Sequence, residues 1–271
     1  MQLPKSSQLA SRLEWRESAG STNLELIQLA GNQQLPNFTV YATANQMSGR
    51  GRSGRVWETP ANSALAISVL LHPPMSSPED LGKLGWLPLI AGLAMSQTVA
   101  SVLGDHSGNP SGQSPNVGLK WPNDVLVNEQ KICGVLTELV GNSVVIGAGI
   151  NLSQTQEQLP IPTATSLNLQ GAELPTALEE RFDLILSSYL QNLSELYNRF
   201  TNLGLDAVAS GIRQQIINGC ITLGREVRAE LPDGSSSIGR AATIDDTGRL
   251  VLDVNGQVLP LSAADIVHLR H

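Results

Sequence analysis

Three arginines alternate with three glycines in the segment 49–57, which reads Gly-Arg-Gly-Arg-Ser-Gly-Arg-Val-Trp. Arginine carries a permanent charge and a planar set of N–H donors that suits phosphate and carboxylate oxygens. Glycine lets the backbone adopt positive φ and approach a ligand closely. Because unpaired charges and glycines are costly to order, the pattern favours a loop that settles around an anion. A solvated arginine-rich surface loop is the alternative.

Two of the four lysines, Lys120 and Lys131, belong to one predicted hairpin. Residues 119–124 open this hairpin, 125–127 form its first strand, 128–130 its turn and 131–139 its return strand. Strict alternation along the return strand would place Lys131, Cys133 and Val135 on one face and residues 132, 134 and 136 on the other. The hairpin therefore adds lysine charges that an anionic ligand would need.

A third polar group, Ser21-Thr22-Asn23, precedes the apolar periodic run that begins at Leu24. Serine, threonine or asparagine before such a run is an N-cap signal and predicts a helix start. Two interpretations are open. The side chains cap the helix and do nothing else, or they and the free N–H groups of the helix start also face a polar ligand.

These groups together could surround one negatively charged site. Phosphoryl or adenylyl transfer needs such a site, because it brings together anions that repel each other. The four histidines lie in no triad-like setting, and no nucleophilic serine or cysteine motif is present. The sequence thus favours chemistry by positioning and charge over acid–base or covalent catalysis.

The composition narrows the class of protein. The chain has 271 residues, a formal net charge of -7 and 41% hydrophobic residues, which is enough for a large domain and a small one. The acidic balance argues against a protein that coats nucleic acid. No signal peptide or membrane span is expected, and the two cysteines show no zinc spacing. A cytoplasmic location is the default expectation.

The elements expected along the chain suggest an α+β fold. Strands are predicted at 39–44, 63–71 and 143–152, a helix at 84–103, and a mainly helical region at 163–201 with a capping box at Thr176 and Glu179. The Gly/Ser/Pro-rich stretch 104–116 reads as a loop. Gly147 and Gly149 inside a strand indicate a bulge, a ligand near the backbone, or a tight crossing of another strand. From 219 on, short strands with turns every 8 to 10 residues predict a small β-barrel, so domains are expected at 1–218 and 219–271.

The motifs, taken in order, resemble those of the biotin protein ligases. Residues 49–57 resemble the GRGRxGRxW signature, 120–124 with Lys131 and Gly134 the KWPND…K..G segment, 21–23 an early STN element, and 147–151 a GxGIN strand. The resemblance covers about 21–152, and the tail resembles the family's small SH3-like domain. It implies a mixed β-sheet flanked by helices, like the catalytic domain of class II aminoacyl-tRNA synthetases. Ser53 departs from the pattern, because that position is often basic.

The resemblance implies a two-step reaction. Biotin and ATP, with Mg²⁺, would give biotinyl-5′-AMP, and a lysine of a biotin carboxyl carrier protein domain of acetyl-CoA carboxylase would then take the biotin. Expected catalytic residues are Arg50, Arg52, Lys131 and Asp124. Expected biotin-binding residues are Ser21, Thr22, Asn23, Gln46, Gly49, Arg50, Gly51, Arg52, Lys131 and Gly134. Expected ATP or adenylate contacts are Arg52, Arg55, Trp57, Asn123, Lys131 and Asn151.

Several points stay open on sequence alone. Trp57 would stack on adenine or anchor the loop to the core, and Asn123 and Asp124 would orient nucleotide, metal or the incoming lysine. Metal ligands are not identified, and a homodimer is one option. The first 20 residues leave no room for the DNA-binding domain of bifunctional members, so neither nucleic acid nor membrane is an expected partner. The alternatives are a lipoate or octanoate ligase or transferase of related fold, a biotin-responsive regulator, and an inactive binding module.

Overall fold

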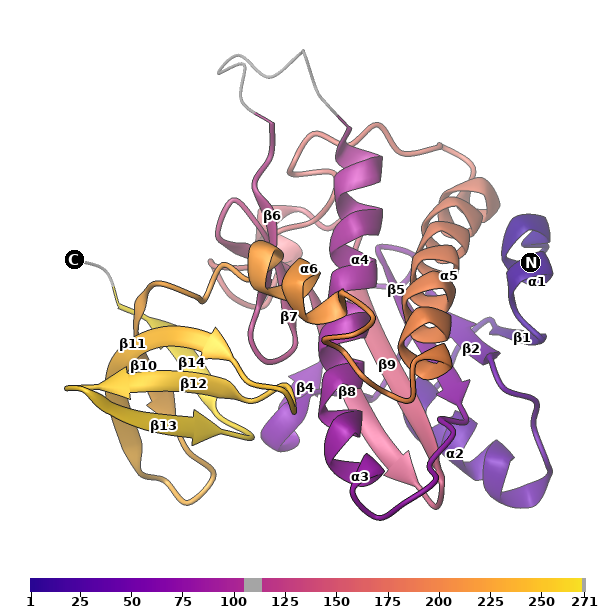
Figure 1. The fold of residues 1–271 in the computed structure, drawn as a ribbon. Helices are drawn as coiled ribbons and strands as arrows, with labels where there is room; N and C mark the ends of the chain where they lie inside the picture. The colour runs from indigo at the N-terminus through magenta and orange to yellow at the C-terminus, as the bar shows by residue number, and fades with distance from the viewer. Residues whose placement is uncertain (105–113, 270–271) are drawn as a thin grey trace.

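The structure is a computed structural model that describes residues 1–104 and 114–269. Its fold is α+β: a seven-stranded mixed sheet with helices on its faces is followed by a five-stranded antiparallel sheet (Figure 1). This arrangement confirms the predicted fold class. The predicted loop 104–116 lies mainly outside the described residues.

The large sheet has the strand order β1-β2-β5-β9-β8-β7-β6. Strands β1 and β2 run parallel, and every other neighbouring pair is antiparallel. The strand bounds are β1 Arg12–Arg16, β2 Thr39–Thr43, β5 Ala64–Leu71, β6 Val117–Lys120, β7 Asp124–Val127, β8 Gln130–Val140 and β9 Ser143–Asn151. Central β5 is buried at every position, as expected for an apolar strand covered on both faces.

Two long helices cover one face of this sheet. Helix α4 (Leu87–Leu103) is apolar almost all round and is buried between the sheet and α5 (Leu178–Asn202), which buries one apolar stripe. The stretch Asp80–Leu103, which also contains α3 (Asp80–Lys83), is long and apolar enough to cross a membrane, but 67% of its most apolar 18-residue segment is buried inside the protein. It is therefore read as a core helix.

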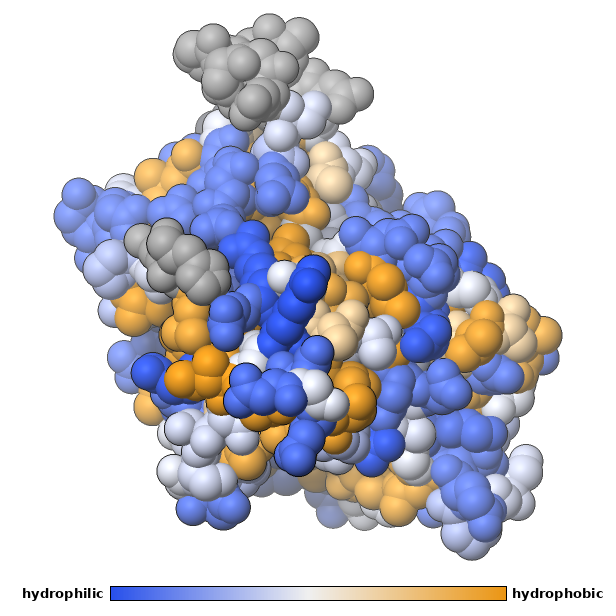
Figure 2. All heavy atoms as spheres, turned by 60° about the vertical axis from the view of Figure 1, so that its left-hand side comes forward, coloured by the Kyte–Doolittle hydropathy of each residue, from blue (hydrophilic) through white to orange (hydrophobic). Residues whose placement is uncertain are grey.

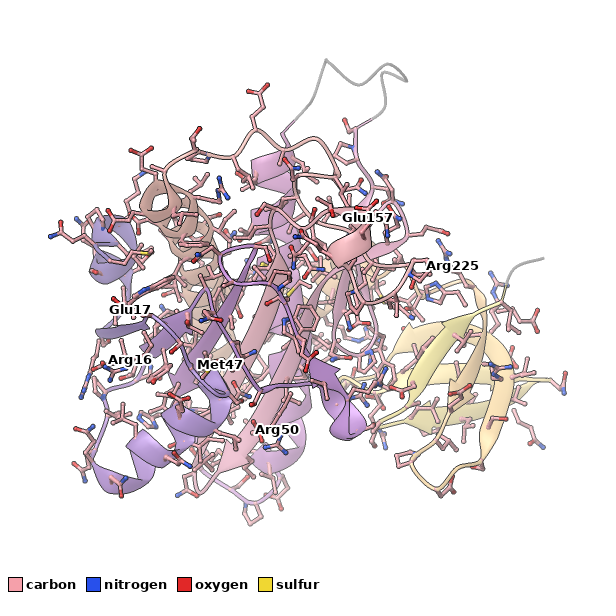
Figure 3. The ribbon with its side chains drawn as sticks, turned by 180° about the vertical axis from the view of Figure 1, so that it is seen from behind. Arg16, Glu17, Met47, Arg50, Glu157 and Arg225 are labelled. Atoms are coloured by element: carbon pink, nitrogen blue, oxygen red, sulfur yellow. The ribbon has the colours of Figure 1, made fainter. Side chains whose placement is uncertain are left out.

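The opposite face of the sheet carries α2 (Thr22–Asn32) and the segment 44–57, which is called the crossing segment below. Leu26 of α2 packs on this face with Tyr41, Leu70 and Val145. The segment beyond β2 then passes over the sheet and forms a small hairpin of β3 (Gly49–Arg50) and β4 (Val56–Trp57). Figure 3 shows this face, with Met47 and Arg50 in front of the sheet. This topology leaves a candidate ligand site between the sheet and the crossing segment.

The second sheet is joined firmly to the first. Its order is β13-β12-β11-β10-β14, with β10 Glu226–Glu230, β11 Ser236–Ile244, β12 Leu250–Val254, β13 Gln257–Leu261 and β14 Asp265–His268. Trp86 and Trp121, both buried in the first domain, donate indole N–H bonds to the carbonyls of Asp246 (2.9 Å) and Gly248 (3.1 Å). Figure 2 brings this side forward and shows hydrophobic residues in separate groups among hydrophilic ones. The sheet follows α6 (Ile212–Gly219); the exact boundary at 218/219 stays a prediction.

The predicted strands at 39–44, 63–71 and 143–152 and the helix at 84–103 are confirmed within a few residues. The first 20 residues, for which no element was predicted, contain α1 (Pro4–Leu9) and β1; Ser6 bonds Asp183 of α5, and β1 pairs in parallel with β2. The predicted start of the helical region was wrong. Helix α5 begins only at Leu178, and its N-cap Ala177 makes no side-chain cap, so the expected capping box at Thr176 does not form.

Candidate active site

A cavity of about 370 Å³ lies between the open face of the large sheet and the crossing segment. Its floor is a row of residues paired directly across five strands, which places their side chains on one face. The row reads Ala66, Gly149, Gly134, Asp124 and Lys120 on β5, β9, β8, β7 and β6. All five line the cavity. The floor is thus bare near the middle of the sheet and charged toward its β6 edge.

The glycines of β9 make room for side chains that cross the sheet. A Cβ at Gly149 would come within 2.6 Å of Trp57 Cε2, and a Cβ at Gly147 would overlap the side chain of Asn23. The pairing of β9 with β5 and β8 continues without a shift through both positions. Neither a bulge nor a strand crossing explains these glycines; a tryptophan and an asparagine side chain occupy the space.

The glycine–arginine segment forms a hairpin that is held in place by its backbone. Gly49 pairs with Trp57, and the amide of Gly51 donates to the Arg55 carbonyl at 2.7 Å. Gly54 has φ of 73°, in the region that favours glycine. A side chain at Gly49 would overlap the Trp57 carbonyl, and Gly49 itself does not line the cavity. Gly49 is therefore placed as a packing residue of the hairpin.

The three arginines of this segment reach three different parts of the protein. Arg50 lies 3.9 Å from Glu138 of β8 and is half exposed. Arg52 donates to the Asn123 side chain (3.2 Å) and to the Ala264 carbonyl (3.4 Å), and burial lowers the pKa of its guanidinium. Arg55 forms a 2.6 Å ion pair with Asp265 of β14. The segment is thereby tied to the second sheet.

Lys131 lines the cavity beside Gly134. Its Nζ is 2.7 Å from Asp124 Oδ1 and 5.8 Å from the centroid of the Trp57 ring, a cation–π distance. The pairing of β7 with β8 shifts by one residue between Val125 and Leu126, because Ile132 is an extra residue on β8. This bulge puts Lys131 beside Gly134 and buries both Ile132 and Cys133, so the predicted strict alternation was wrong.

The end of the cavity near α2 carries uncharged polar side chains, with the Arg50–Glu138 pair beside them. The backbone N–H and the hydroxyl of Thr22 lie 2.9 and 3.2 Å from Gln46 Oε1, and Ser68 Oγ lies 2.8 Å from Thr22 Oγ1. Ser21 occupies the N-cap position of α2 but makes no side-chain cap, and it lines the cavity. Asn23 donates to the Leu136 carbonyl and to Glu138, and therefore also braces this wall.

The remaining predicted residues are also gathered here. Every predicted site residue except Gly49 lines the cavity. Asn151 does so while its amide donates to the Thr165 carbonyl (2.9 Å) and accepts from Gln154 (2.9 Å), which fixes the segment after β9. Trp57 packs over Gly149, as an anchor of the hairpin would. The structure thus collects residues from 21 to 151 around one space.

Sequence reasoning left several lining residues out of the predicted site. They include Lys120, Pro160, Ile161, Ala164, Asp265 and Ile266. Residues 163 and 164 were expected to begin a mainly helical region, but they run beside β8, with the Lys131 amide donating to the Thr163 carbonyl. Asp265 and Ile266 belong to the second sheet, for which no site role was predicted. Lys120 could have been predicted as a site residue, because it belongs to the same hairpin as Lys131.

The described residues contain no group of three histidine, cysteine, aspartate or glutamate side chains able to hold a metal ion. Three carboxylates line the cavity: Asp124 and Asp265 are each paired with a cation, and the third is Glu58. The donor set therefore does not fit a metal held by the protein alone.

Comparisons with known proteins identify the family of the chain. The family model described as the biotin/lipoate A/B protein ligase family matches residues 17–154, and the biotin protein ligase C terminal domain matches 222–269. A biotin--[acetyl-CoA-carboxylase] ligase of Mycobacterium tuberculosis is 36% identical over 94% of this chain and 90% of its own length. A ligase with the same description from Paracoccus denitrificans is 30% identical, covering 89% and 94%.

Among solved structures, a biotin protein ligase from Aquifex aeolicus in complex with biotin and ATP aligns with a TM-score of 0.73 and 24% identity. It covers 96% of this chain and all of that one, and it supports the fold. The two matched family models, together with the 36% identical relative, show that the chain belongs to the biotin protein ligase family.

Proposed function

We propose that this protein activates biotin with ATP to biotinyl-5′-AMP and transfers the biotin to a lysine of the biotin carboxyl carrier domain of acetyl-CoA carboxylase. The observation that carries the proposal is the cavity itself: a polar end with the uncharged side chains of Thr22 and Gln46 is joined over a glycine floor to a cationic end at Lys131 and Arg52. The family membership and the described activity of the relatives support the same reaction.

The polar end suits the ureido ring of biotin. A ureido group offers two N–H donors and a carbonyl acceptor, and hydroxyl and amide side chains can match both kinds of atom. Ser21, Thr22 and Gln46 supply such groups in one wall of the cavity. The dithiolane ring of lipoate has no comparable hydrogen-bonding groups, so it would leave these side chains unpaired at a cost. We therefore favour biotin over lipoate.

The cationic end suits adenylate formation. A carboxylate oxygen of biotin attacks the α-phosphorus, a P–O bond forms, and the bond to the β-phosphoryl group breaks with its electron pair leaving on pyrophosphate. Lys131 and Arg52 would offset the repulsion between the two approaching anions. Lys131 is held by Asp124 and Trp57 rather than left mobile, so its charge is positioned before the substrates arrive.

In the second step the amine of the acceptor lysine attacks the biotinyl carbonyl, and AMP leaves. Asp124 is the cavity carboxylate next to Lys131, and Asn123 holds the Val135 carbonyl (2.6 Å) and Arg52. These contacts support a role for both residues in orienting the adenylate. We propose that Mg²⁺ enters with the ATP phosphates, because residues 1–104 and 114–269 offer it no preformed cage. The two free, buried cysteines are consistent with the proposed cytoplasmic location.

The test measures pyrophosphate release by the purified full chain with Mg-ATP and either biotin or lipoate, and biotin attachment to a purified carrier domain. Biotin-dependent release and labelling of one carrier lysine are expected, with lipoate about 100-fold or more less effective. Absence of biotin-dependent release would overturn the proposed function, and equal use of lipoate would replace it with the lipoate alternative.

A matched pair of variants tests the polar end. Thr22→Val removes a hydroxyl that faces the cavity and should raise the KM for biotin by about 10- to 100-fold without a similar change for ATP. Thr201→Val removes a hydroxyl near the end of α5, where it bonds only the helix backbone, and should leave both KM values unchanged. Equal effects on biotin and ATP would contradict this placement of the ring.

A further inference from the structure

Lys120 is a cationic side chain in the cavity that the two-step reaction above does not use. It ends β6, is half buried, and is the direct cross-strand partner of Asp124. The other four cations that line the cavity each have a partner: Arg50 with Glu138, Arg52 with Asn123, Arg55 with Asp265 and Lys131 with Asp124. Within residues 1–104 and 114–269, no ion pair or hydrogen bond of the Lys120 ammonium is formed.

An unpaired ammonium in this position is costly for the folded protein. Burial lowers the pKa of Lys120, and the nearby charges of Lys131 and Arg55 act in the same direction, against the attraction of Asp124 and Asp265. A methionine of similar length at position 120 would pack as well and would stabilise the folded protein more, because it buries no charge. The charge is therefore explained better by a ligand than by stability.

The position of Lys120 indicates which part of the ligand it meets. From the polar end the floor runs through Gly149, Gly134 and Asp124 to Lys120, so Lys131 lies between the proposed biotin end and Lys120. Neighbouring strands are about 4.8 Å apart, which puts Lys120 roughly 10 Å beyond the Gly134 strand. In an in-line displacement the leaving group departs on the side opposite the nucleophile. A carboxylate that arrives from the polar end therefore expels its leaving group toward Lys120.

We propose that Lys120 is a catalytic residue that binds the departing pyrophosphate in adenylate formation. The proposal rests on the proposed function. As the α-phosphorus–oxygen bond breaks, its electron pair moves onto the pyrophosphate, and the ammonium of Lys120 stabilises that growing charge without giving up a proton. Lys131 stabilises the α-phosphoryl and carboxylate oxygens, so the two lysines act on opposite sides of the reacting phosphorus.

The experiment compares wild type, Lys120→Met and Lys120→Arg in ATP–pyrophosphate exchange and in transfer from chemically prepared biotinyl-AMP. Lys120→Met should raise the pyrophosphate concentration for half-maximal exchange by about 10- to 100-fold and slow adenylate formation by a similar factor. Inhibition by AMP, which lacks the β- and γ-phosphates, and transfer from biotinyl-AMP should stay within about twofold. Lys120→Arg should recover part of the pyrophosphate binding.

Lys5→Met is the matched control, because Lys5 is exposed on α1 far from the cavity, and it should change none of these values. The melting temperature of Lys120→Met should equal or exceed that of wild type, which separates a loss of chemistry from a loss of folding. An unchanged pyrophosphate dependence in Lys120→Met, with an active wild type, would overturn the role of Lys120 alone. A loss confined to transfer from biotinyl-AMP would instead assign Lys120 to docking of the carrier.

Discussion

Replacing Gly149 by alanine should damage catalysis far more than stability. The new Cβ would lie 2.6 Å from Trp57 Cε2 and 2.8 Å from Nε1, whereas ordinary contacts begin at 3.4 Å. The indole ring must therefore retreat from the sheet by about 0.8 Å. Because Trp57 pairs with Gly49 at the base of the hairpin, the ring carries the glycine–arginine segment with it.

The relative losses of stability and rate depend on which part of the structure moves to accommodate the new Cβ. Trp57 belongs to a two-residue strand beside exposed Val56, so the hairpin can yield, and overpacking here should cost no more than about 1–3 kcal/mol of the unfolding free energy. A displacement near 1 Å in a positioned catalytic group can reduce a rate by about 100-fold. We expect adenylate formation to fall by roughly 10- to 100-fold, with a native far-UV spectrum.

Gly134→Ala provides a graded comparison. Its Cβ would meet Lys131 Nζ at 3.3 Å and Trp57 at 3.5 Å, so a flexible lysine end needs to move only slightly. Its loss of rate should be clearly smaller than that of Gly149→Ala. Gly31→Ala in α2, which has no atom within 4 Å of the new Cβ, is the control and should be fully active.

The measurement is biotin-dependent pyrophosphate release at saturating ATP, together with thermal unfolding. In a double-mutant cycle, Gly149→Ala should add little to the loss already caused by Trp57→Ala, since both displace the same ring. The reasoning is refuted if Gly134→Ala is the more damaging change, or if the effects of Gly149→Ala and Trp57→Ala are additive.

Three further outcomes are expected. Lys131→Ala should reduce adenylate formation by about 2–4 kcal/mol, roughly 30- to 1000-fold, and affect transfer from preformed biotinyl-AMP much less; equal losses would make Lys131 a general support. Arg52→Gly should keep some adenylation but release biotinyl-AMP, seen as biotin on added serum albumin; labelling at the wild-type level would exclude Arg52 as the retaining residue. Burial and the charges of Lys120 and Arg225, opposed by Glu129, lower the pKa of His268 to about 4. The folded state therefore holds this imidazole neutral while the unfolded chain protonates it below about pH 6.5. The contribution of His268 to stability should be complete above about pH 6.5 and should be lost as the pH falls toward 4. The melting temperature of His268→Gln should therefore change less than that of wild type between pH 7.5 and 5; an identical change would contradict the assignment.

Much of the fold could be predicted because local pattern and tertiary burial agree. The apolar run of β5, the periodic stripe of α5 and the short strands after Gly219 each have a single solution that buries their hydrophobic residues. The site residues could be predicted for a different reason. Alternating glycine and arginine is a combination that serves packing poorly, so it indicates an anion, and the order of several motifs then identifies the family.

The features of the site that could not be predicted depend on contacts between residues that are distant in sequence. One extra residue at Ile132 turns Lys131 to the same face as Gly134, and no local signal distinguishes this bulge from regular alternation. The same holds for Gly147 and Gly149, whose missing side chains are understood only once Asn23 and Trp57 are seen above them. Asp265 was missed because an aspartate near the end of a small β domain carries no motif of its own.

The charges of the cavity explain how an acidic protein can attract two anionic substrates. Five cationic and three carboxylate side chains line it, a formal charge of +2 in a chain whose net charge is -7. Asp124 and Asp265 neutralise Lys131 and Arg55, whereas Arg52 bonds only uncharged oxygens and Lys120 has no partner among the described residues. Arg52 bonds Asn123, in the turn that joins β6 to β7, and Lys120 ends β6, so both uncompensated charges lie at the β6–β7 end of the cavity. Such an arrangement attracts a multiply charged nucleotide to this end of the cavity and offsets the repulsion between the two anions that must meet there.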